Sequence, residues 1–510
     1  MVPPGRAPFA FIGVVAAIAL AWRLVDVADW PSEYPTIQYE SALASRTILL
    51  AASSQRTPEQ DAWQKRTGNQ YIASPPILPG LVAGANAIIG DETPWVSRVF
   101  TIGFWLAAGG FVYAAAVRFT ASRWAGAVGF AYFVFVPFGM VLSRCFQTEA
   151  LLVFGLAATI WQLARTPERL TWRQTLLTGL VCGAASFVKP GMLFAPLVAG
   201  FAAVIFPRSV PGTLPFKLLH MTLYTALIVG PGTLYAALLL RHHTGRIQPH
   251  LLGEAWFYEG VADNMWGVVG TAGLVGLIGI GLAARSRAYV PAGLLIGHLG
   301  TLAIFTYHAA THTYYQAPLL VLTAVALAWP IAALERSRFG WNRTRSYRIA
   351  WATCLTAILA LYLVATRKSD LGPWRYVPER RARLDAATAR HRDQIAKAKI
   401  IREAVGGESP ILELTDVYGY PLMFYAGLEV LKWPSLDDQF YNAHVAGGDA
   451  TPFSAEDTLR QMNPDGHWKF FAITDLEEWN RQPQLQAALR RYGPPREPAA
   501  GVLIFDLRGR

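Results

Sequence analysis

The chain has 510 residues, of which 53% are hydrophobic and only 15% are charged. Soluble proteins carry about 25% charged residues, so this composition excludes a soluble globule of this length. The net charge of +11 is explained by membrane topology, and we expect no nucleic-acid partner. Cys145, Cys182 and Cys354 lie in or beside apolar runs, and their separations indicate core packing, not a disulfide framework or a metal knuckle.

Apolar runs of roughly 15 to 23 residues recur up to residue 366, and most are long enough to cross a hydrocarbon core of about 30 Å. There are about eleven, approximately at 8–28, 95–117, 124–141, 149–165, 174–188, 190–206, 218–240, 264–284, 289–306, 315–334 and 349–366. The first continues through Trp22 and is followed by others, which favours a signal anchor over a cleaved signal peptide. The sequence therefore predicts an all-α polytopic membrane protein.

Lys and Arg residues are distributed unevenly between the connectors of these runs. With the N-terminus in the cytoplasm, the cytoplasmic connectors hold 15 Lys or Arg in 53 residues, and the opposite connectors hold 8 in 107. Because cytoplasmic connectors are enriched in Lys and Arg, this orientation is the expected one. It predicts a multi-pass protein of the plasma (inner) membrane whose first loop and C-terminal segment are extracytoplasmic.

The first connector, residues 29–94, is long and rich in charged side chains. These include Asp29, Glu33, Glu40, Arg46, Glu59, Asp61, Asp91 and Glu92. Pro35 is well placed at the start of a helix that reaches residue 53 and could lie on the membrane surface. A second helix is expected after Pro76, but its roughly 14 residues before Gly90 are too few for a span.

Several polar residues lie at the predicted outer ends of the spans, where leaving a charge in lipid would cost several kcal/mol. Arg144 and Glu149 flank one outer turn, Lys189 occupies another, and a third outer segment carries His308, His312, Tyr314 and Tyr315. With Glu33 and Glu40, they would form one outward site of carboxylates, cations and hydroxyls.

Each of these residues also has a simpler explanation. Arg144 could reach lipid headgroups, Tyr314 and Tyr315 could belong to an interfacial aromatic belt, and Glu40 could lie on the polar face of a surface helix. Lys189 precedes Pro190 in a very short turn, which favours a functional role. A separate group, His242, His243 and His250 with Glu254 and Glu259, is more typical of a structural loop than of a metal site.

Carboxylates, cations and hydroxyls together suit the transfer of a group from a phosphate leaving group. A glutamate can act as the base for an incoming hydroxyl, while Arg144 and Lys189 can hold the departing negative charge. Arginine can also bind a phosphate through two parallel hydrogen bonds. Nucleotide sugars are not expected outside the cytoplasm, so a donor linked to a lipid phosphate fits this position.

Residues 367–510 change to the composition of a soluble protein and are predicted to form a small extracytoplasmic α/β domain beside the membrane domain 1–366. A charged amphipathic helix is expected at 379–405. Strands are expected at 411–414, 470–473 and 501–507, with helices near 455–462 and 476–492. This domain could cover the outer face, or it could be a solubilising cap without chemistry.

Five short segments, in this order, resemble one family of enzymes. They are YESALASR at 39–46, SPPILPGL at 74–81, SRCFQTE at 143–149, VKP at 188–190 and HTYYQAP at 312–318. Over residues 1 to about 366 the chain resembles the C-fold (GT-C), polyprenyl-phosphate-dependent glycosyltransferases. This class, similar to glycosyltransferase family 39, includes the protein O-mannosyltransferases and the lipid A aminoarabinose transferase.

The resemblance implies an inverting transfer of a sugar from a polyprenyl-phosphate donor to an extracytoplasmic lipid, glycan or protein. Many members have an adjacent acidic pair where this chain has Ile37 and Gln38, so Glu33 or Glu40 is the expected catalytic base. The expected donor-binding residues are Arg144, Lys189, Glu149, His312, Tyr314, Tyr315 and Arg46. A divalent cation (Mg or Mn) is left open, with Asp29 and Glu149 as candidate ligands.

Two other classes of function remain at this point. A transporter or flippase of lipid-linked sugars would require paired repeats with interrupted helices near the bilayer midplane, and the sequence has no such halves. A non-catalytic membrane scaffold would leave Glu40, Arg144, Lys189 and His312 scattered in the structure.

Overall fold

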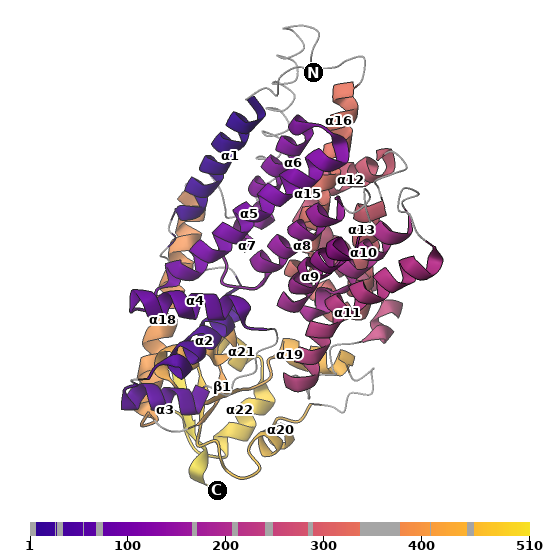
Figure 1. The fold of residues 1–510 in the computed structure, drawn as a ribbon. Coiled ribbons are helices and arrows are strands. Elements are labelled where there is room, and N and C mark those ends of the chain that lie inside the picture. Colours follow the sequence, from indigo (N-terminus) through magenta and orange to yellow (C-terminus); the bar gives the residue numbers. More distant parts are fainter. Residues whose placement is uncertain are drawn as a thin grey trace. The chain divides into compact units, whose positions relative to one another are not determined.

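The computed structural model describes residues 7–25, 27, 34–54, 56–67, 75–165, 171–206, 213–239, 248–283, 289–336, 378–407, 410–445 and 453–509. The chain divides into two compact units, whose elements are labelled in Figure 1. The first unit comprises residues 1–27, 73–75 and 97–380, and the second comprises 28–72, 76–96 and 381–510. Glu33, Asp29 and the expected span at 349–366 lie outside the described residues.

The secondary-structure elements described in the first unit are all helices. Its helices are α1 (Ala7–Leu24), α5 (Pro94–Thr120), α6 (Arg123–Phe135), α7 (Pro137–Leu142), α8 (Glu149–Leu163), α9 (Trp172–Val188), η2 (Pro190–Met192), α10 (Phe194–Ile205), α11 (Leu214–Leu239), η3 (Pro249–Gly253), α12 (Ala255–Leu282), α13 (Tyr289–Ile304), α14 (Thr306–Thr311), η4 (Thr313–Gln316), α15 (Pro318–Ala326) and α16 (Ala328–Arg336).

The first ten apolar runs expected from the sequence all fall on these helices. The run at 124–141 is broken into α6 and α7 before Pro137, because proline has no backbone N–H to continue the helical bonding. The helix that contains the run at 264–284, α12, is longer than expected. It begins at Ala255 and has a kink at Gly270, where φ is 54°. Local hydrophobicity therefore predicted where the helices lie, whereas each break or kink within a helical run depends on a single residue.

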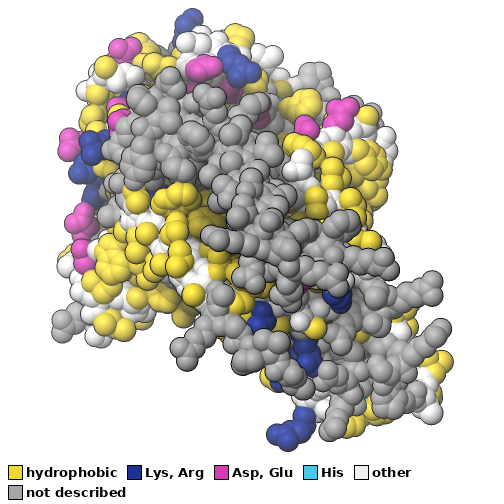
Figure 2. Space-filling model, turned by 90° about the horizontal axis from the view of Figure 1, so that it is seen from above, with side chains coloured by type: hydrophobic (Ala, Val, Ile, Leu, Met, Phe, Trp, Pro, Cys, Tyr) yellow, Lys and Arg dark blue, Asp and Glu magenta, His cyan; other side chains and the backbone are white. Residues whose placement is uncertain are grey.

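Three described helical segments are long and apolar enough to cross a membrane, by length and composition: Pro94–Thr120, Ala255–Leu282 and Thr313–Arg336. Five further apolar helices are shorter, namely Pro8–Leu24, Ile77–Ile89, Glu149–Leu163, Pro190–Ile205 and Tyr289–Ile304. Hydrophobic side chains cover broad areas of the face drawn in Figure 2. Large exposed apolar side chains of this kind include Leu180, Leu219 and Ile278, as expected of lipid-facing helices.

Small residues allow some of these helices to approach closely. A side chain added at Gly297 of α13 would come within 2.2 Å of the backbone oxygen of Phe194 on α10, and one at Gly293 would come within 2.9 Å of Ala199 Cα. Close backbone approach through small residues is a common way to pack helices in a membrane, where the hydrophobic effect adds little.

The second unit contains a five-stranded mixed sheet in the order β2-β1-β3-β5-β4. Its strands are β1 (Ile411–Leu414), β2 (Val430–Lys432), β3 (Phe470–Ile473), β4 (Arg496–Ala499) and β5 (Val502–Asp506). β1 pairs in parallel with both β2 and β3, while β5 runs antiparallel to β3 and β4. All residues of β1 and β3 are buried, which is typical of strands covered on both faces.

Helices pack on the two faces of this sheet. On one face, Ala398 and Ile401 of α18 (Pro378–Ala404) pack against Ile411 and Phe470. The other face is covered by side chains of α20 (Ala455–Met462), α21 (Leu476–Asn480) and α22 (Pro483–Arg490), which surround Leu412 and Phe471. Another helix, α19 (Leu436–Val445), follows β2, and the short helices η7 (Asp416–Gly419) and η9 (Leu507–Gly509) follow β1 and β5.

The strands expected at 411–414 and 470–473 and the helix expected at 455–462 have these bounds in the structure, and the strand expected at 501–507 is one residue shorter at each end. The helix expected at 476–492 is divided into α21 and α22 before Pro483. The short strands β2 and β4 were not expected, since neither has the alternating apolar pattern of a half-buried strand.

Three helices of the first loop also belong to the second unit: α2 (Pro35–Ala52), α3 (Pro58–Thr67) and α4 (Ile77–Ile89). The two expected helices are confirmed as α2 and α4, and Gly90 ends α4 in the left-handed conformation, as glycine commonly does. Tyr39 and Leu43 of α2 share a buried cluster with Met423 and Phe424. This part of the loop therefore packs with the C-terminal segment.

Glu413 is a fully buried carboxylate in the central strand β1. Neither of its oxygens has a hydrogen-bond partner among the described residues, and a side chain added at Gly419 would lie 3.0 Å from its Cδ. Burial raises the pKa of Glu413 to about 8, although Thr415 and Lys432 oppose the shift. The carboxyl group is therefore largely protonated at neutral pH.

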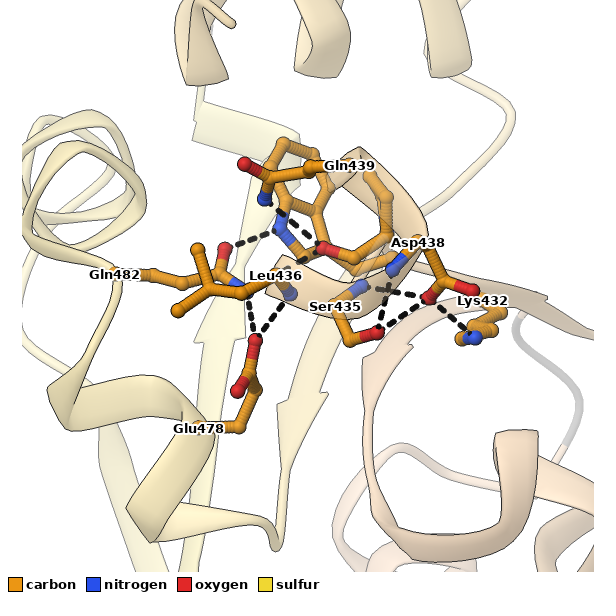
Figure 3. Close-up of polar contacts among 9 residues, drawn as sticks. Lys432, Ser435, Leu436, Asp438, Gln439, Glu478 and Gln482 are labelled. Atoms are coloured by element: carbon orange, nitrogen blue, oxygen red, sulfur yellow. Dashed lines mark hydrogen bonds and ion pairs between the residues drawn. The ribbon is translucent and has the colours of Figure 1, made fainter. Parts of the chain in front are cut away.

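Lys432 of β2, whose charge lowers the pKa of Glu413, forms its ion pair with a different carboxylate. Lys432 forms an ion pair of 2.5 Å with Asp438, whose carboxylate also accepts hydrogen bonds from Ser435 (Figure 3). In the same segment, Trp433 donates to Gln482 and the Leu436 N–H donates to Glu478. The segment after β2 is thus held by a polar network of its own, and the Lys432 ammonium is paired with Asp438 within that network.

Glu413→Gln is expected to stabilise the protein at alkaline pH. Because the folded pKa of Glu413 is raised from 4.5 to about 8, its contribution to stability is complete below pH 4.5 and is lost as the pH rises towards 8. Glutamine avoids this loss, so the full-length variant should unfold several degrees higher than the parent at pH 8, and by a smaller margin at pH 5. Tryptophan fluorescence during heating measures both.

The exposed Glu497→Gln is the matched control, and it should show no comparable pH-dependent gain. A gain for Glu413→Gln that is equal at pH 5 and pH 8 would contradict the argument, because it would not depend on ionisation of the carboxyl group.

Candidate active site

A buried ion pair joins two of the expected site residues in the first unit. Glu149 is the first residue of α8, and Lys189 is the residue that ends α9 before Pro190. Lys189 Nζ lies 2.6 Å from Glu149 Oε1, and the Glu149 side chain is only 2% exposed. Burying a charge costs much free energy unless the charge is paired. Each of these two residues therefore lowers the cost of burying the other.

Aromatic rings surround the Lys189 ammonium group. Its Nζ lies 4.8 Å from the ring centroid of Tyr314 and 4.3 Å from that of Tyr315, both in η4. His312 precedes them and contacts both rings, with centroid distances of 5.3 Å to Tyr314 and 6.3 Å to Tyr315. His308 stacks on His312 at 5.2 Å. The structure thus brings together five expected side chains and His308 from three regions of the sequence.

The segment that supplies these rings is itself fixed by buried polar contacts. Asn264 of α12 donates to the backbone oxygens of Ala309 and Ala310 and accepts from the hydroxyl of Thr313. His298 and Gln316 form a second buried pair, with 3.0 Å between Nε2 and Oε1. Gln316 and Asn264 therefore hold both ends of η4, and this support should keep Tyr314 and Tyr315 in place.

Arg144 lies in the same unit, where it contacts the backbone that follows α1. Its Nη2 donates to the backbone oxygen of Val25 at 2.6 Å, just beyond the end of α1. Arg98 donates similarly to Val27 at 2.8 Å. Cations commonly satisfy the last carbonyls of a helix, so both arginines hold the segment that leads from α1 into the first loop.

Arg23 is fully buried on α1 and was not expected to be a site residue. Its guanidinium donates to Ser143 at 2.7 Å, to Val134 at 2.7 Å and to Ala19 at 3.1 Å. Asn264 was missed in the same way. A polar residue inside the apolar run at 8–28 for Arg23, and at the start of the run at 264–284 for Asn264, was the available sequence signal, because such residues in a membrane span usually face a partner or a cavity.

The remaining expected residues belong to the second unit or lie outside the described residues. Glu40 is half-buried on α2, where its neighbour Tyr39 packs in the core. Arg46 of the same helix forms an ion pair of 2.8 Å with Glu92. Glu33 and Asp29 are not among the described residues, so the choice between Glu33 and Glu40 remains a prediction.

No group of three or more metal-binding side chains occurs within the part of the chain that the structure describes. His250, Glu254 and Glu259 are included in that part, whereas His242 and His243 are not. Cys145 and Cys182 are buried and form no disulfide within the described part of the chain; their burial agrees with a packing role.

The Lys189–Glu149 pair has a chemistry suited to a charged, hydroxyl-bearing ligand. Glu149 Oε2 has no hydrogen-bond partner among the described residues, and it can accept a hydrogen bond from a ligand hydroxyl. The Lys189 ammonium can bind a phosphate oxygen, and in a dry pocket such an interaction is stronger than in water. The tyrosine rings can pack against the carbon faces of a sugar.

Comparison with known proteins adds a family match over part of the chain. The model of a family described as dolichyl-phosphate-mannose-protein mannosyltransferase matches residues 73–235. That segment includes Glu149 and Lys189. A search among curated proteins found no significant match.

Solved structures match nearly the whole chain. ArnT from Cupriavidus metallidurans bound to undecaprenyl phosphate has a TM-score of 0.55 and 14% identity, covering 97% of this chain and 98% of that one. An Archaeoglobus fulgidus oligosaccharyltransferase tethered with an acceptor peptide has a TM-score of 0.56 and 13% identity, covering 92% and 69%. The same organism's AglB, in complex with an inhibitory peptide and a dolichol-phosphate, has a TM-score of 0.54 and 14% identity, covering 96% and 72%.

At these identities the similarity shows the fold. The chain has the fold of these membrane proteins, and the resemblance to C-fold glycosyltransferases that was inferred from five short segments is confirmed.

Proposed function

We propose that the protein is a membrane glycosyltransferase that transfers a hexose or pentose from a polyprenyl-phosphate donor to an extracytoplasmic hydroxyl or amine. Its acceptor is a lipid, a glycan or a protein. The observation that carries the proposal is the buried Lys189–Glu149 pair beneath two tyrosine rings, within a fold that matches an enzyme structure bound to undecaprenyl phosphate over 97% of this chain.

The reaction breaks the bond between the anomeric carbon of the sugar and the phosphate oxygen of the carrier. The acceptor oxygen or nitrogen attacks from the opposite face, so the configuration is inverted. The proton of the acceptor passes to a carboxylate base, and the lipid phosphate leaves with the electron pair of the broken bond. Base catalysis of this kind typically contributes about 10²–10⁴-fold to a rate.

Specific residues take these roles in the proposal. Glu33 or Glu40 is the base that removes the acceptor proton. Arg144 and Lys189 stabilise the negative charge that develops on the departing phosphate. Glu149, together with His312, Tyr314 and Tyr315, shapes the pocket for the sugar.

The membrane topology follows from the distribution of Lys and Arg. The distribution places the N-terminus in the cytoplasm and the first loop outside the inner membrane. An odd number of spans, about eleven, then puts the C-terminal domain outside as well. A lipid-linked donor is available on that side without a nucleotide. The base and the carrier phosphate would then face the same compartment as the acceptor.

Mass spectrometry of envelope glycolipids and glycans from cells with and without the protein tests this proposal. Deletion is expected to remove one sugar from one class of acceptor, and the wild-type protein should restore it. Accumulation of the polyprenyl-phosphate sugar in the deletion strain would identify the donor. Unchanged glycolipids and glycans, combined with an unchanged pool of lipid-linked sugars, would contradict the proposal.

A further inference from the structure

Three side chains of the first loop donate hydrogen bonds to backbone carbonyls of one short segment in the C-terminal region. Trp63 Nε1 donates to Met423 at 3.0 Å, Arg46 Nη1 to Phe424 at 2.6 Å, and Arg66 Nε to Gly427 at 2.6 Å. The acceptors lie in or just after η8 (Leu422–Ala426), a turn of π-helix. Such turns are rare in proteins, and many of those that occur lie at functional sites.

Arg46 is the most extensively held of these donors. Its Nε forms an ion pair of 2.8 Å with Glu92, and its Cζ lies 3.6 Å from the centroid of the Phe424 ring. The ring of Trp63 lies 5.2 Å from the same Cζ. A planar guanidinium can stack on a ring and donate hydrogen bonds in its plane at once, which a lysine ammonium cannot do. Arginine is therefore specifically required at this position.

Glycine is required at residue 427. Its φ is +60°, and a side chain added there would come within 2.7 Å of Trp63 Cδ1. A residue with a side chain would have both a strained backbone and a collision with the indole ring. The close contact of Gly427 with Trp63 thus depends on the absence of a side chain.

Helix α2 is also fixed at Tyr39, the residue next to Glu40. Tyr39 is 3% exposed, and its hydroxyl lies 3.1 Å from His391 Nδ1 on α18. Tyr420 packs against the cluster that contains Tyr39 and Leu43. Burial raises the pKa of Tyr420, and the charge of Glu40 raises it further.

We propose that η8 and Gly427 hold helices α2 and α3 together, and that Arg46 on α2, with Trp63 and Arg66 on the neighbouring α3, act as positioning residues for α2 and the Glu40 carboxylate that it carries. We call this arrangement the η8 clamp; it comprises the carbonyls of Met423, Phe424 and Gly427 and the side chains of Arg46, Trp63 and Arg66. The C-terminal region then contributes to catalysis by orienting the first loop. This inference rests on the proposed function, in which the first loop supplies the base.

The clamp gives Arg46 a role different from donor binding. A donor-binding arginine would affect mainly the KM for the donor, whereas a positioning residue should affect mainly kcat. A misplacement of about 1 Å can cost about 10²-fold in rate. The partition between KM and kcat therefore separates the two roles.

Arg46→Lys, Trp63→Phe and Gly427→Ala test the clamp in the full-length protein in lipid nanodiscs. Trp63→Phe removes a single hydrogen bond and replaces the indole by a smaller aromatic ring, which is the mildest of the three changes, so it should fold even if the other two variants do not. Each variant is expected to increase hydrogen exchange of the amides in 35–52 by at least about 5-fold. Each should lower kcat for sugar transfer by about 10-fold or more, with the donor KM changed less than about 3-fold.

Arg56→Lys is the matched control, because Arg56 forms an exposed ion pair with Asp61 in the same loop, outside the clamp. It should leave both hydrogen exchange and kcat unchanged. Unchanged exchange of α2 in all three clamp variants would overturn the proposal, as would a rise in donor KM with kcat preserved. If the wild-type protein transfers no sugar at all, the proposed function fails, while the exchange measurement still decides whether the clamp holds α2.

Discussion

Lys189→Met is expected to lower kcat/KM for sugar transfer by about 10²–10³-fold, the loss typical for removal of one charged group that stabilises a transition state. The variant removes the cation and leaves Glu149, whose side chain is 2% exposed, without its partner. An unpaired buried carboxylate is also destabilising. Affinity for undecaprenyl phosphate, measured by native mass spectrometry or thermal shift, should fall with the activity.

The double variant Lys189→Met/Glu149→Gln separates the two causes. It removes the unpaired carboxylate, so it should recover much of the thermal stability that Lys189→Met loses. It should not recover undecaprenyl phosphate binding or transfer. Lys217→Met, on α11 of the same unit, is the control and should behave as the wild type. Normal phosphate binding by a folded Lys189→Met protein would exclude Lys189 as the group that holds the carrier phosphate.

Replacement of both Glu33 and Glu40 by Gln is expected to reduce kcat by roughly 10²–10⁴-fold, the usual contribution of a general base. The amide keeps the size of the side chain but cannot accept the acceptor proton. Because neither glutamate is assigned to the donor phosphate, affinity for undecaprenyl phosphate should persist. Single variants then identify the base, since only one of them should reproduce the loss seen in the double variant.

Glu59→Gln is the control for this experiment. Glu59 pairs with Arg402 at an exposed position, where an ion pair is worth at most about 1 kcal/mol, so activity should change little. If the double variant transferred sugar at the wild-type rate, neither glutamate could be the base, and the catalytic role of this part of the first loop would be wrong.

Local sequence was sufficient for most helices and for the principal strands. The start of α2 at Pro35, the end of α4 at Gly90 and the strand β1 follow from proline, glycine and short apolar patterns, because these features act within a few residues. The breaks before Pro137 and Pro483 have the same local cause. Turns between apolar runs that carry a lysine or a glutamate were also visible in the sequence, and they identified Lys189 and Glu149.

The sequence did not predict which side chains these residues contact. Lys189 and Glu149 are 40 residues apart, and Tyr315 lies far from both, so only helix packing could bring them together. Arg46 was expected to bind the donor because its position in the chain resembles that of a family element. Its stacking on Phe424 depends on a segment 378 residues away, and no local pattern encodes that contact.

The sequence by itself determined that this is a polytopic helical membrane protein with a charged first loop, since length and hydrophobicity decide which segments can enter a bilayer. It also located the lysine, glutamate and tyrosines of the candidate site. Only the tertiary structure decided that Lys189 is neutralised by Glu149 beneath two rings, and that the first-loop helices form one unit with the C-terminal sheet. Such contacts arise from complementary surfaces of distant segments, and their free energy depends on shape and burial that no single stretch of sequence contains.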